Sequence, residues 1–171
     1  MFRVGQGALL EVPLVHPGGP FWANKDDGAW STPKGEFDGD EDRLTAARRE
    51  FAEETGFSPQ GQFLDLGAIR QRTGKTIQVW AVAGDWAADQ LKSNTFEMEW
   101  PRNSGQVKSF PEVDRAAWFD TATARKKISK GQAGFIDRLM TVLDRTGQLP
   151  QRSNRLNAPS HPADEIASQG W

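Results

Sequence analysis

The sequence predicts an α+β domain, because strand-like and helix-like patterns are interleaved along most of its length. Alternating apolar residues predict strands in several short segments, and a 3.6-residue apolar period predicts helices at 42–54 and 132–145. A chain of 171 residues has room for one domain with a sizeable core. Residues 149–171 show neither period, so we expect a domain over 1–148 and a polar C-terminal tail that is disordered or loosely docked.

The composition excludes several classes of protein. The chain contains no cysteine, which rules out disulfides, a thiol nucleophile and a thiolate zinc site. No stretch approaches the roughly 18–20 apolar residues of a membrane span. The N-terminus also lacks the apolar segment of a secretory signal. We therefore expect a cytoplasmic protein with no membrane partner.

The charge is unevenly distributed along the chain. The net charge is −2, yet residues 26–57 contain ten acidic and four basic side chains, a net of −6, which leaves +4 for the remainder. An acidic site surrounded by basic residues suits a polyanionic substrate that arrives with its metal. Ordinary surface variation would produce the same numbers, so charge alone does not decide the function.

The N-terminal region is expected to hold little more than one strand. Residues 2–16 contain two apolar runs, and Pro13 interrupts the second, which predicts a sheet edge or a bulge. We expect His16 at the surface, at the end of this strand. The loop at 17–27 carries Phe21 and Trp22, for which packing is the favoured interpretation and flanking of a bound base the alternative.

Further strands and helices are expected in the second half of the domain. A hairpin is predicted from two strands separated by a turn that contains Gly74. We expect a polar loop at 101–111, and a helix that starts after the capping residue Asp120. The predicted strands are 62–71, 75–83, 95–100 and 116–119.

The helix predicted at 42–54 has clear signals at both ends. Asp40 or Asp42 can cap its N-terminus, and Gly56 follows its last turn, where a left-handed residue often ends a helix. An apolar stripe should face the core, and Glu54 borders it and should be partly buried. The stripe consists of Leu44, Ala47 and Phe51.

Three acidic residues lie on one side of this helix. Glu50, Glu53 and Glu54 are spaced i, i+3 and i+4, which places their Cβ atoms about 5–6 Å apart. Such carboxylates repel one another unless a positive charge compensates them, and Arg49 alone cannot neutralise three acids. Mg²⁺ prefers carboxylate oxygens together with substrate phosphates. The spacing therefore indicates phosphate chemistry through a bound metal, against the simpler interpretation of a solvated acidic face.

The full spacing around these acids is more specific than the acids alone. Residues 35–57 fit the pattern G-x5-E-x7-R-E-U-x-E-E-x-G-U, with U a bulky apolar residue. In this the chain closely resembles the Nudix hydrolase family. The resemblance implies an α/β/α sandwich with a mixed β-sheet. The N-terminal strand region departs from the family pattern, since relatives commonly carry more residues there, and we expect it to be shortened. The matching positions are Gly35, Glu41, Arg49, Glu50, Phe51, Glu53, Glu54, Gly56 and Phe57.

The resemblance also implies a reaction and a cofactor. Family members hydrolyse nucleoside diphosphate-linked compounds, such as nucleoside triphosphates and dinucleoside polyphosphates, by attack of water on phosphorus. Mg²⁺ is the implied cofactor, and Mn²⁺ can substitute for it. The implied metal ligands are Glu50, Glu53, Glu54 and the Gly35 carbonyl. Arg49 is expected to orient Glu50 or Glu53, and Glu41 is a partner for Arg49, an outer ligand or a purely structural residue.

The general base is left open between two positions. In some relatives a glutamate of the motif, here Glu53 or Glu54, takes the proton; in others an acid on a later loop does so. Glu112 is the candidate of the second kind, because it lies six residues before Trp118, a spacing similar to that of a later-loop glutamate in relatives that cleave 8-oxo-dGTP. Glu97 and Glu99 are weaker candidates.

The expected partner is a small-molecule nucleoside polyphosphate. Lys34, Arg72 and Arg102 are candidates for contacts with its phosphates, and Lys34 is the strongest because it adjoins the predicted metal site. Two alternatives remain open: an RNA 5′-end pyrophosphohydrolase, in which case the partner is a nucleic acid, and a nucleotide-binding module without turnover. The chain has no long basic stripe with interleaved aromatic residues, which disfavours the RNA alternative.

Overall fold

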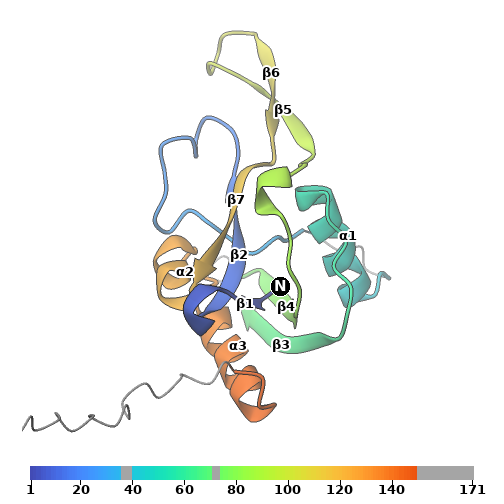
Figure 1. Cartoon of the computed structure of the whole chain (residues 1–171). Helices are drawn as coiled ribbons and strands as arrows, with labels where there is room; N and C mark the ends of the chain where they lie inside the picture. Colours follow the sequence, from blue (N-terminus) through green and yellow to red (C-terminus); the bar gives the residue numbers. More distant parts are fainter. Residues whose placement is uncertain (36–39, 71–73, 150–171) are drawn as a thin grey trace, which may run out of the picture.

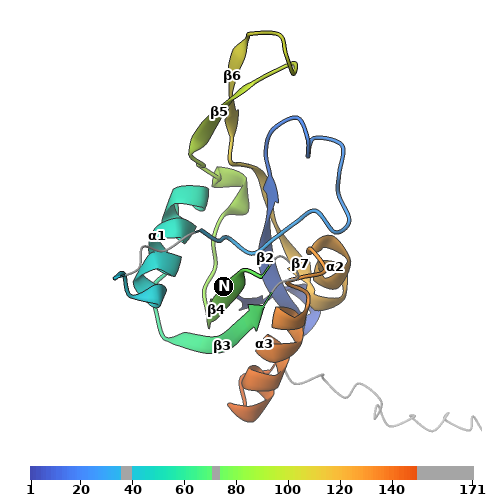
Figure 2. The ribbon, with the colours of Figure 1, turned by 180° about the vertical axis from the view of Figure 1, so that it is seen from behind.

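The strands of the protein lie between one helix on one side and two helices on the other (Figures 1 and 2). A computed structural model describes residues 1–35, 40–70 and 74–149. Helix α1 (Arg43–Thr55) covers one side, and α2 (Thr121–Lys127) and α3 (Gly134–Arg145) cover the other. This arrangement confirms the predicted α+β sandwich.

Within the described residues, the strands form three antiparallel groups. The largest has the order β1-β2-β7, and the others are the pairs β3-β4 and β5-β6. A parallel bridge between Phe2 and Ala83 joins the first group to the end of β4, which makes the arrangement mixed. The strands are β1 (Arg3–Val4), β2 (Leu10–Pro17), β3 (Phe63–Arg70), β4 (Thr76–Val82), β5 (Thr95–Glu99), β6 (Val107–Pro111) and β7 (Val113–Asp120), and the 3-10 turns are η1 (Gln6–Ala8) and η2 (Ala88–Gln90).

Pro13 occupies a locally unpaired side of β2. It lies opposite Trp118 of β7, whereas β1 pairs with β2 only through Glu11 and Leu10. Because β1 ends before it reaches Pro13, no strand on that side needs the N–H that proline lacks. Proline is tolerated here for the same reason that it is tolerated on an edge strand. The irregularity of the strand lies between His16 and Pro17 instead.

The expectation of a polar loop at 101–111 is wrong in its second half. Residues Val107–Pro111 form β6, which pairs with β5 from Thr95↔Pro111 to Glu99↔Val107. The strand is missed because its two large apolar side chains, Val107 and Phe110, are three residues apart and most of its residues are exposed, so that no alternating apolar pattern marks it. The hairpin extends away from the helices, at the top of Figure 1.

The expectation that His16 lies at the surface is also wrong. Its side chain is 0% exposed and packs edge-on against Trp30, with ring centroids 5.2 Å apart. Nδ1 lies 2.7 Å from Asp114 Oδ1, and Nε2 lies 2.9 Å from the Lys25 carbonyl oxygen. These bonds satisfy the buried ring and attach the loop after β2 to β7. The favoured packing of Phe21 and Trp22 is not observed, because both side chains are exposed, at 43% and 37%, although the Phe21 ring contacts Trp100 edge-on at 5.3 Å.

Helix α1 begins and ends where the sequence predicts. Asp42 Oδ1 accepts a hydrogen bond from the Thr45 N–H at 2.9 Å, which satisfies one of the free donors of the first turn. Gly56 adopts a left-handed conformation with φ of 73° and donates its N–H to the Ala52 carbonyl at 2.8 Å. Phe51 is buried, as the apolar stripe predicts, together with Ala46.

The core lies between the strands and α3. Helix α3 buries Phe135, Ile136, Leu139 and Leu143, which carry the predicted apolar period, and Asp120 caps α2 through the N–H groups of its first turn. No helix in the described part of the chain is long and apolar enough to cross a membrane. The proposed tail from residue 149 onward lies outside the described residues, apart from Leu149.

Candidate active site on helix α1 and beside β4

The segment that precedes the motif is attached to the C-terminal half of α1. The Lys34 N–H donates a hydrogen bond to Glu54 Oε2 at 3.0 Å, and Lys34 Nζ lies 3.9 Å from Glu54 Oε1. The first of these bonds fixes the backbone, and the second brings a flexible ammonium group to the same carboxylate. A cation and a carboxylate from different parts of the motif therefore meet at one point.

Gly35 lies directly against the carboxylate of Glu50. A Cβ atom at position 35 would be 1.7 Å from Glu50 Oε2, a distance at which no side chain fits. The glycine is therefore required by the close approach of its backbone to this carboxylate. The structure thus places together two of the residues that the sequence assigns to the metal.

Arg49 holds three acidic side chains around its guanidinium group. Nη1 lies 2.8 Å from Glu50 Oε1 and 3.3 Å from Glu53 Oε2, and Nη2 lies 3.1 Å from Glu41 Oε2. These hydrogen bonds raise the pKa of Arg49. Arg49 thus fixes the direction of both Glu50 and Glu53, and it links them to Glu41 at the start of the helix.

Glu54 is the most buried acid of the motif. The residue is 8% exposed, and burial raises the pKa of its carboxyl group to about 7, with smaller contributions in the same direction from the charges of Glu50 and Glu112. Lys34 opposes the shift through its charge and its N–H. A buried carboxylate with a pKa near neutrality is typical of functional sites, where such a group binds a cation or exchanges a proton.

Glu112 reaches the same site from a distant part of the sequence. Its N–H donates to the Asn94 carbonyl at 2.8 Å, and the Asn94 N–H donates to the Glu53 carbonyl at 3.3 Å. Its charge acts on the carboxyl group of Glu54. The side chain of Glu112 makes no hydrogen bond or ion pair with another described residue.

The carboxylates of the motif have the chemistry of a Mg²⁺ site but do not converge on one point. Among the described residues, no three acidic or histidine side chains are arranged to hold a metal ion. Glu50 and Glu53 are directed toward Arg49, and Glu54 toward Lys34. Glu53 is the most exposed of the three, with 42% of its side chain accessible. By its chemistry, a set of three carboxylates and a backbone carbonyl supplies the oxygen ligands that a hard divalent cation prefers.

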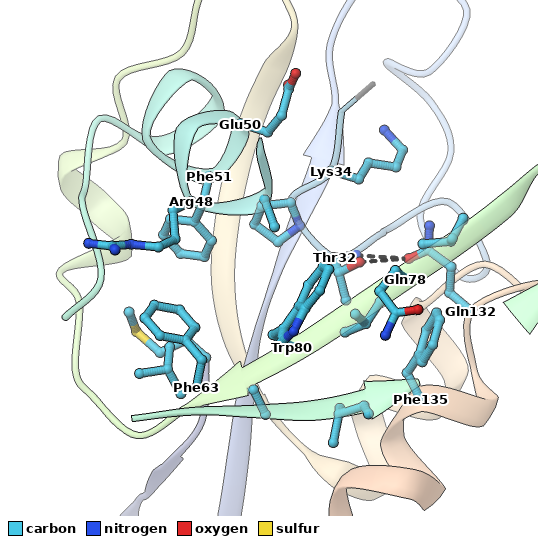
Figure 3. A pocket seen from close by; sticks show the side chains of 18 of the residues that line it. Thr32, Lys34, Arg48, Glu50, Phe51, Phe63, Gln78, Trp80, Gln132 and Phe135 are labelled. Carbon is cyan, nitrogen blue, oxygen red and sulfur yellow. Dashed lines mark hydrogen bonds between the residues drawn. The ribbon is translucent and has the colours of Figure 1, made fainter. Parts of the chain in front are cut away.

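A cavity of about 710 Å³ opens beside these groups (Figure 3). Glu50 and Lys34 lie at one end of it, and the ring of Trp80 stands inside it. The walls come from β2, α1, β3, β4 and the segment that leads into α3, and they are mainly apolar. A volume of this size is typical of small-molecule sites.

Several cavity residues were missed by sequence reasoning. Thr32 and Gln132 are joined by hydrogen bonds across the cavity wall, and Gln78 and Trp80 project from β4. Gln132 is only 2% exposed, and no sequence signal marks it as part of a site. Only a known fold could have pointed to this position, because Gln132 lies a hundred residues from Thr32.

Other candidate residues lie elsewhere or cannot be placed. Arg102 is in the turn between β5 and β6, with its guanidinium 5.0 Å over the ring of Phe21, and it does not line the cavity. Arg72 lies outside the described residues. Glu97 and Glu99 are exposed on β5, where Glu99 accepts a hydrogen bond from the Gly105 N–H at 2.6 Å.

Solved structures with the same fold include proteins that bind or cleave nucleotides. The NUDIX domain of Shewanella oneidensis NrtR complexed with ADP ribose has a TM-score of 0.55 and 18% identity, covering 83% of this chain and 82% of that one. A C. elegans Ap4A hydrolase has a TM-score of 0.54 and 17% identity, covering 84% and 94%. A mutT/nudix family protein from Listeria innocua has a TM-score of 0.57 and 15% identity, covering 86% and 92%.

The family assignment follows from the sequence itself. No curated protein matches the chain significantly. The sequence profile of the NUDIX domain, by contrast, matches residues 12–139, which include most of the described fold and all of α1. Together with the intact motif at 35–57, this match shows that the chain belongs to the Nudix hydrolase family, a family of pyrophosphohydrolases.

Proposed function

We propose that the protein is a metal-dependent hydrolase of nucleoside diphosphate-linked compounds, such as nucleoside triphosphates or dinucleoside polyphosphates. One observation carries the proposal: Glu50 of α1 and Lys34 lie at one end of a cavity large enough for a nucleoside. A diphosphate group at Glu50 and Lys34 would therefore leave the attached nucleoside in the cavity. The similarity to an ADP ribose complex and to an Ap4A hydrolase supports a nucleotide substrate.

The residues that would hold the metal are Glu50, Glu53 and Glu54, with the Gly35 carbonyl. Mg²⁺, for which Mn²⁺ can substitute, supplies charge neutralisation and acidification of an attacking water when bound. Arg49 keeps Glu50 and Glu53 on one side of the helix, because its guanidinium bonds to both. Lys34 is placed to neutralise a phosphate oxygen, since its ammonium group lies beside Glu54 and is half exposed.

We assign the role of general base, which accepts the proton of the attacking water, to Glu112. Its carboxylate makes no hydrogen bond or ion pair with another described residue and lies close enough to Glu54 to influence the pKa of that group. A base outside the metal ligands keeps its acceptor oxygens available while Glu53 and Glu54 bind the cation. Glu54 is the second candidate, because its pKa of about 7 suits a general base.

The shape of the site favours small molecules over RNA. The cavity extends inward from Glu50 and is bounded by β4 and α3, which suits one nucleoside rather than a continuous strand. The alternative of a nucleotide-binding module without turnover predicts the same cavity, so only an activity measurement separates the two.

The test is hydrolysis of a panel of nucleoside triphosphates, dinucleoside polyphosphates, ADP-ribose and 5′-triphosphate RNA with Mg²⁺. We expect cleavage of a phosphoric anhydride bond in at least one small molecule, which yields a nucleotide together with pyrophosphate or phosphate from a triphosphate, a second nucleotide from a dinucleoside polyphosphate, or ribose 5-phosphate from ADP-ribose. Glu53→Gln and Glu54→Gln should each lower turnover by at least about two orders of magnitude, because a metal-site contribution amounts to several kcal/mol.

The matched control is Asp144→Asn, which makes the same change of acid to amide at an exposed position of α3. It should leave turnover unchanged. Nucleotide binding without cleavage of any compound in the panel would establish the binding module instead. Equal turnover in all three variants would reject the role of the motif.

A further inference from the structure

The amide group of Gln132 is held in one orientation inside the cavity. Its Oε1 accepts hydrogen bonds from the Thr32 N–H at 3.0 Å and from the Thr32 hydroxyl at 3.1 Å (Figure 3). A backbone N–H can only donate, so the atom that faces it must be the amide oxygen. The two donors use both lone pairs of that oxygen.

The amide nitrogen of Gln132 is left to face the cavity. Within the described part of the chain this nitrogen makes no hydrogen bond. Every fully buried side-chain nitrogen or oxygen there has a hydrogen-bond partner, so the unpaired nitrogen of Gln132 must be in contact with open space. Gln132 lines the cavity and is otherwise enclosed, with 2% of its surface accessible. It therefore presents hydrogen-bond donors, and no acceptor, to whatever enters.

An aromatic ring lines the same cavity. Trp80 projects from β4 into the cavity, and Figure 3 shows the amides of Gln78 and Gln132 on the same side of its indole ring. A flat base can stack on an aromatic face irrespective of its identity, so Trp80 supplies affinity without selection. Selection between bases is left to the polar groups that line the cavity.

We infer that Gln132 selects bases that carry a keto group, guanine in particular, over adenine. This inference rests on the proposed nucleotide substrate. Glutamine reads adenine by accepting from the N6 amino group while donating to N7. Thr32 prevents this in the present chain, because the accepting oxygen is already fully bonded. Guanine offers two acceptors, O6 and N7, to the donors that remain.

The similar structures do not decide this preference. One of them is a complex with ADP ribose and another is an Ap4A hydrolase, but identities of 17–18% show only that the fold is shared. The orientation of the Gln132 amide is a property of the Thr32–Gln132 pair in this chain.

The test uses GMP and AMP, which contain no anhydride bond, so that their binding is independent of catalysis. Calorimetry on the full chain should show GMP binding at least about 10-fold tighter than AMP, the difference expected for one well-placed base contact. Gln132→Leu should weaken GMP binding and bring the two dissociation constants within about twofold. Thr32→Val frees one lone pair of the amide oxygen and should instead improve AMP binding.

The control is Gln106→Leu, the same change at an exposed position of the β5-β6 turn, which should retain the wild-type preference. Equal or reversed affinities in the wild type, no binding of either nucleotide, or an unchanged ratio in Gln132→Leu would overturn the inference. If Gln132→Leu does not fold, the AMP affinity of Thr32→Val tests the inference instead. Hydrolysis of the panel without a base preference would refute the inference alone. A GMP preference without hydrolysis would refute the proposed activity alone.

Discussion

Replacement of Gly35 by alanine should separate the chemistry of the site from the stability of the fold. The added Cβ would lie 1.7 Å from the carboxylate of Glu50, whereas ordinary contacts begin at 3.4 Å. The carboxylate must therefore retreat by about 1.7 Å, the difference between these distances. A misplacement of about 1 Å in a catalytic group can lower the rate by about 100-fold, so we expect at least that loss of turnover in Gly35→Ala.

The same substitution should cost little stability. The obstructing atoms belong to the far end of a flexible side chain, and the backbone of Gly35 is not in the left-handed region, so the chain need not shift. Alanine also reduces the entropy of the unfolded chain, by about 0.4–1 kcal/mol where its conformation is allowed. The free energy of unfolding should therefore change by less than about 1 kcal/mol.

The assays are turnover with Mg²⁺, Mn²⁺ affinity and urea unfolding in EDTA. The control is Gly84→Ala, where a Cβ would meet the side chain of Met1 at 3.7 Å, an ordinary contact. It should retain both activity and stability. Wild-type turnover in Gly35→Ala would refute the assignment of Glu50 to the metal, and a loss of several kcal/mol of stability would show that the backbone, rather than the carboxylate, had moved.

Three further predictions concern Glu54, Glu112 and the C-terminal tail. The pKa of Glu54 is raised from 4.5 to about 7, so the folded chain binds the proton of this carboxyl group more tightly than the unfolded chain does. In EDTA, the free energy of unfolding should therefore fall by up to about 3 kcal/mol as the pH rises from 4.5 to 7. Glu54→Gln should remove this pH dependence and be more stable than the wild type at pH 8. An equal decline of the free energy of unfolding in both proteins would contradict the raised pKa of Glu54. Glu112→Gln should lower kcat by about 100-fold with unchanged Mn²⁺ affinity, and unchanged kcat would return the role of base to Glu54. Removal of residues 152–171, which lack an apolar period, should leave the melting temperature within a few degrees, whereas a larger drop would identify the tail as a docked part of the fold.

Local signals explain why helix α1 could be predicted from the sequence. The Asp42 cap, the apolar stripe and the left-handed Gly56 all act within one helix, and each is visible in neighbouring residues. The pairing of β3 with β4 is predictable for the same reason, because two strands adjacent in the sequence are joined by a turn.

Contacts between distant segments explain what could not be predicted. His16 is buried because Asp114 and the Lys25 carbonyl satisfy its ring, and neither partner adjoins it in the sequence. The orientation of Gln132 depends on Thr32, a hundred residues away. Strand β6 is defined by its pairing with β5 and carries no apolar pattern of its own. The acidic motif is thus encoded locally, whereas the cavity beside it is assembled by the fold.

The most direct test of a metal site on α1 is a titration of the isotopically labelled protein with Mn²⁺, observed by NMR. Paramagnetic broadening should begin at the amide signals of Gly35, Glu50, Glu53 and Glu54, and spread with distance from them. The triple substitution of Glu50, Glu53 and Glu54 by glutamine should abolish the selective broadening, and Asp144→Asn should preserve it. Broadening that is spread evenly over the surface, or that is identical in the triple variant, would contradict the assignment of a metal site to this helix.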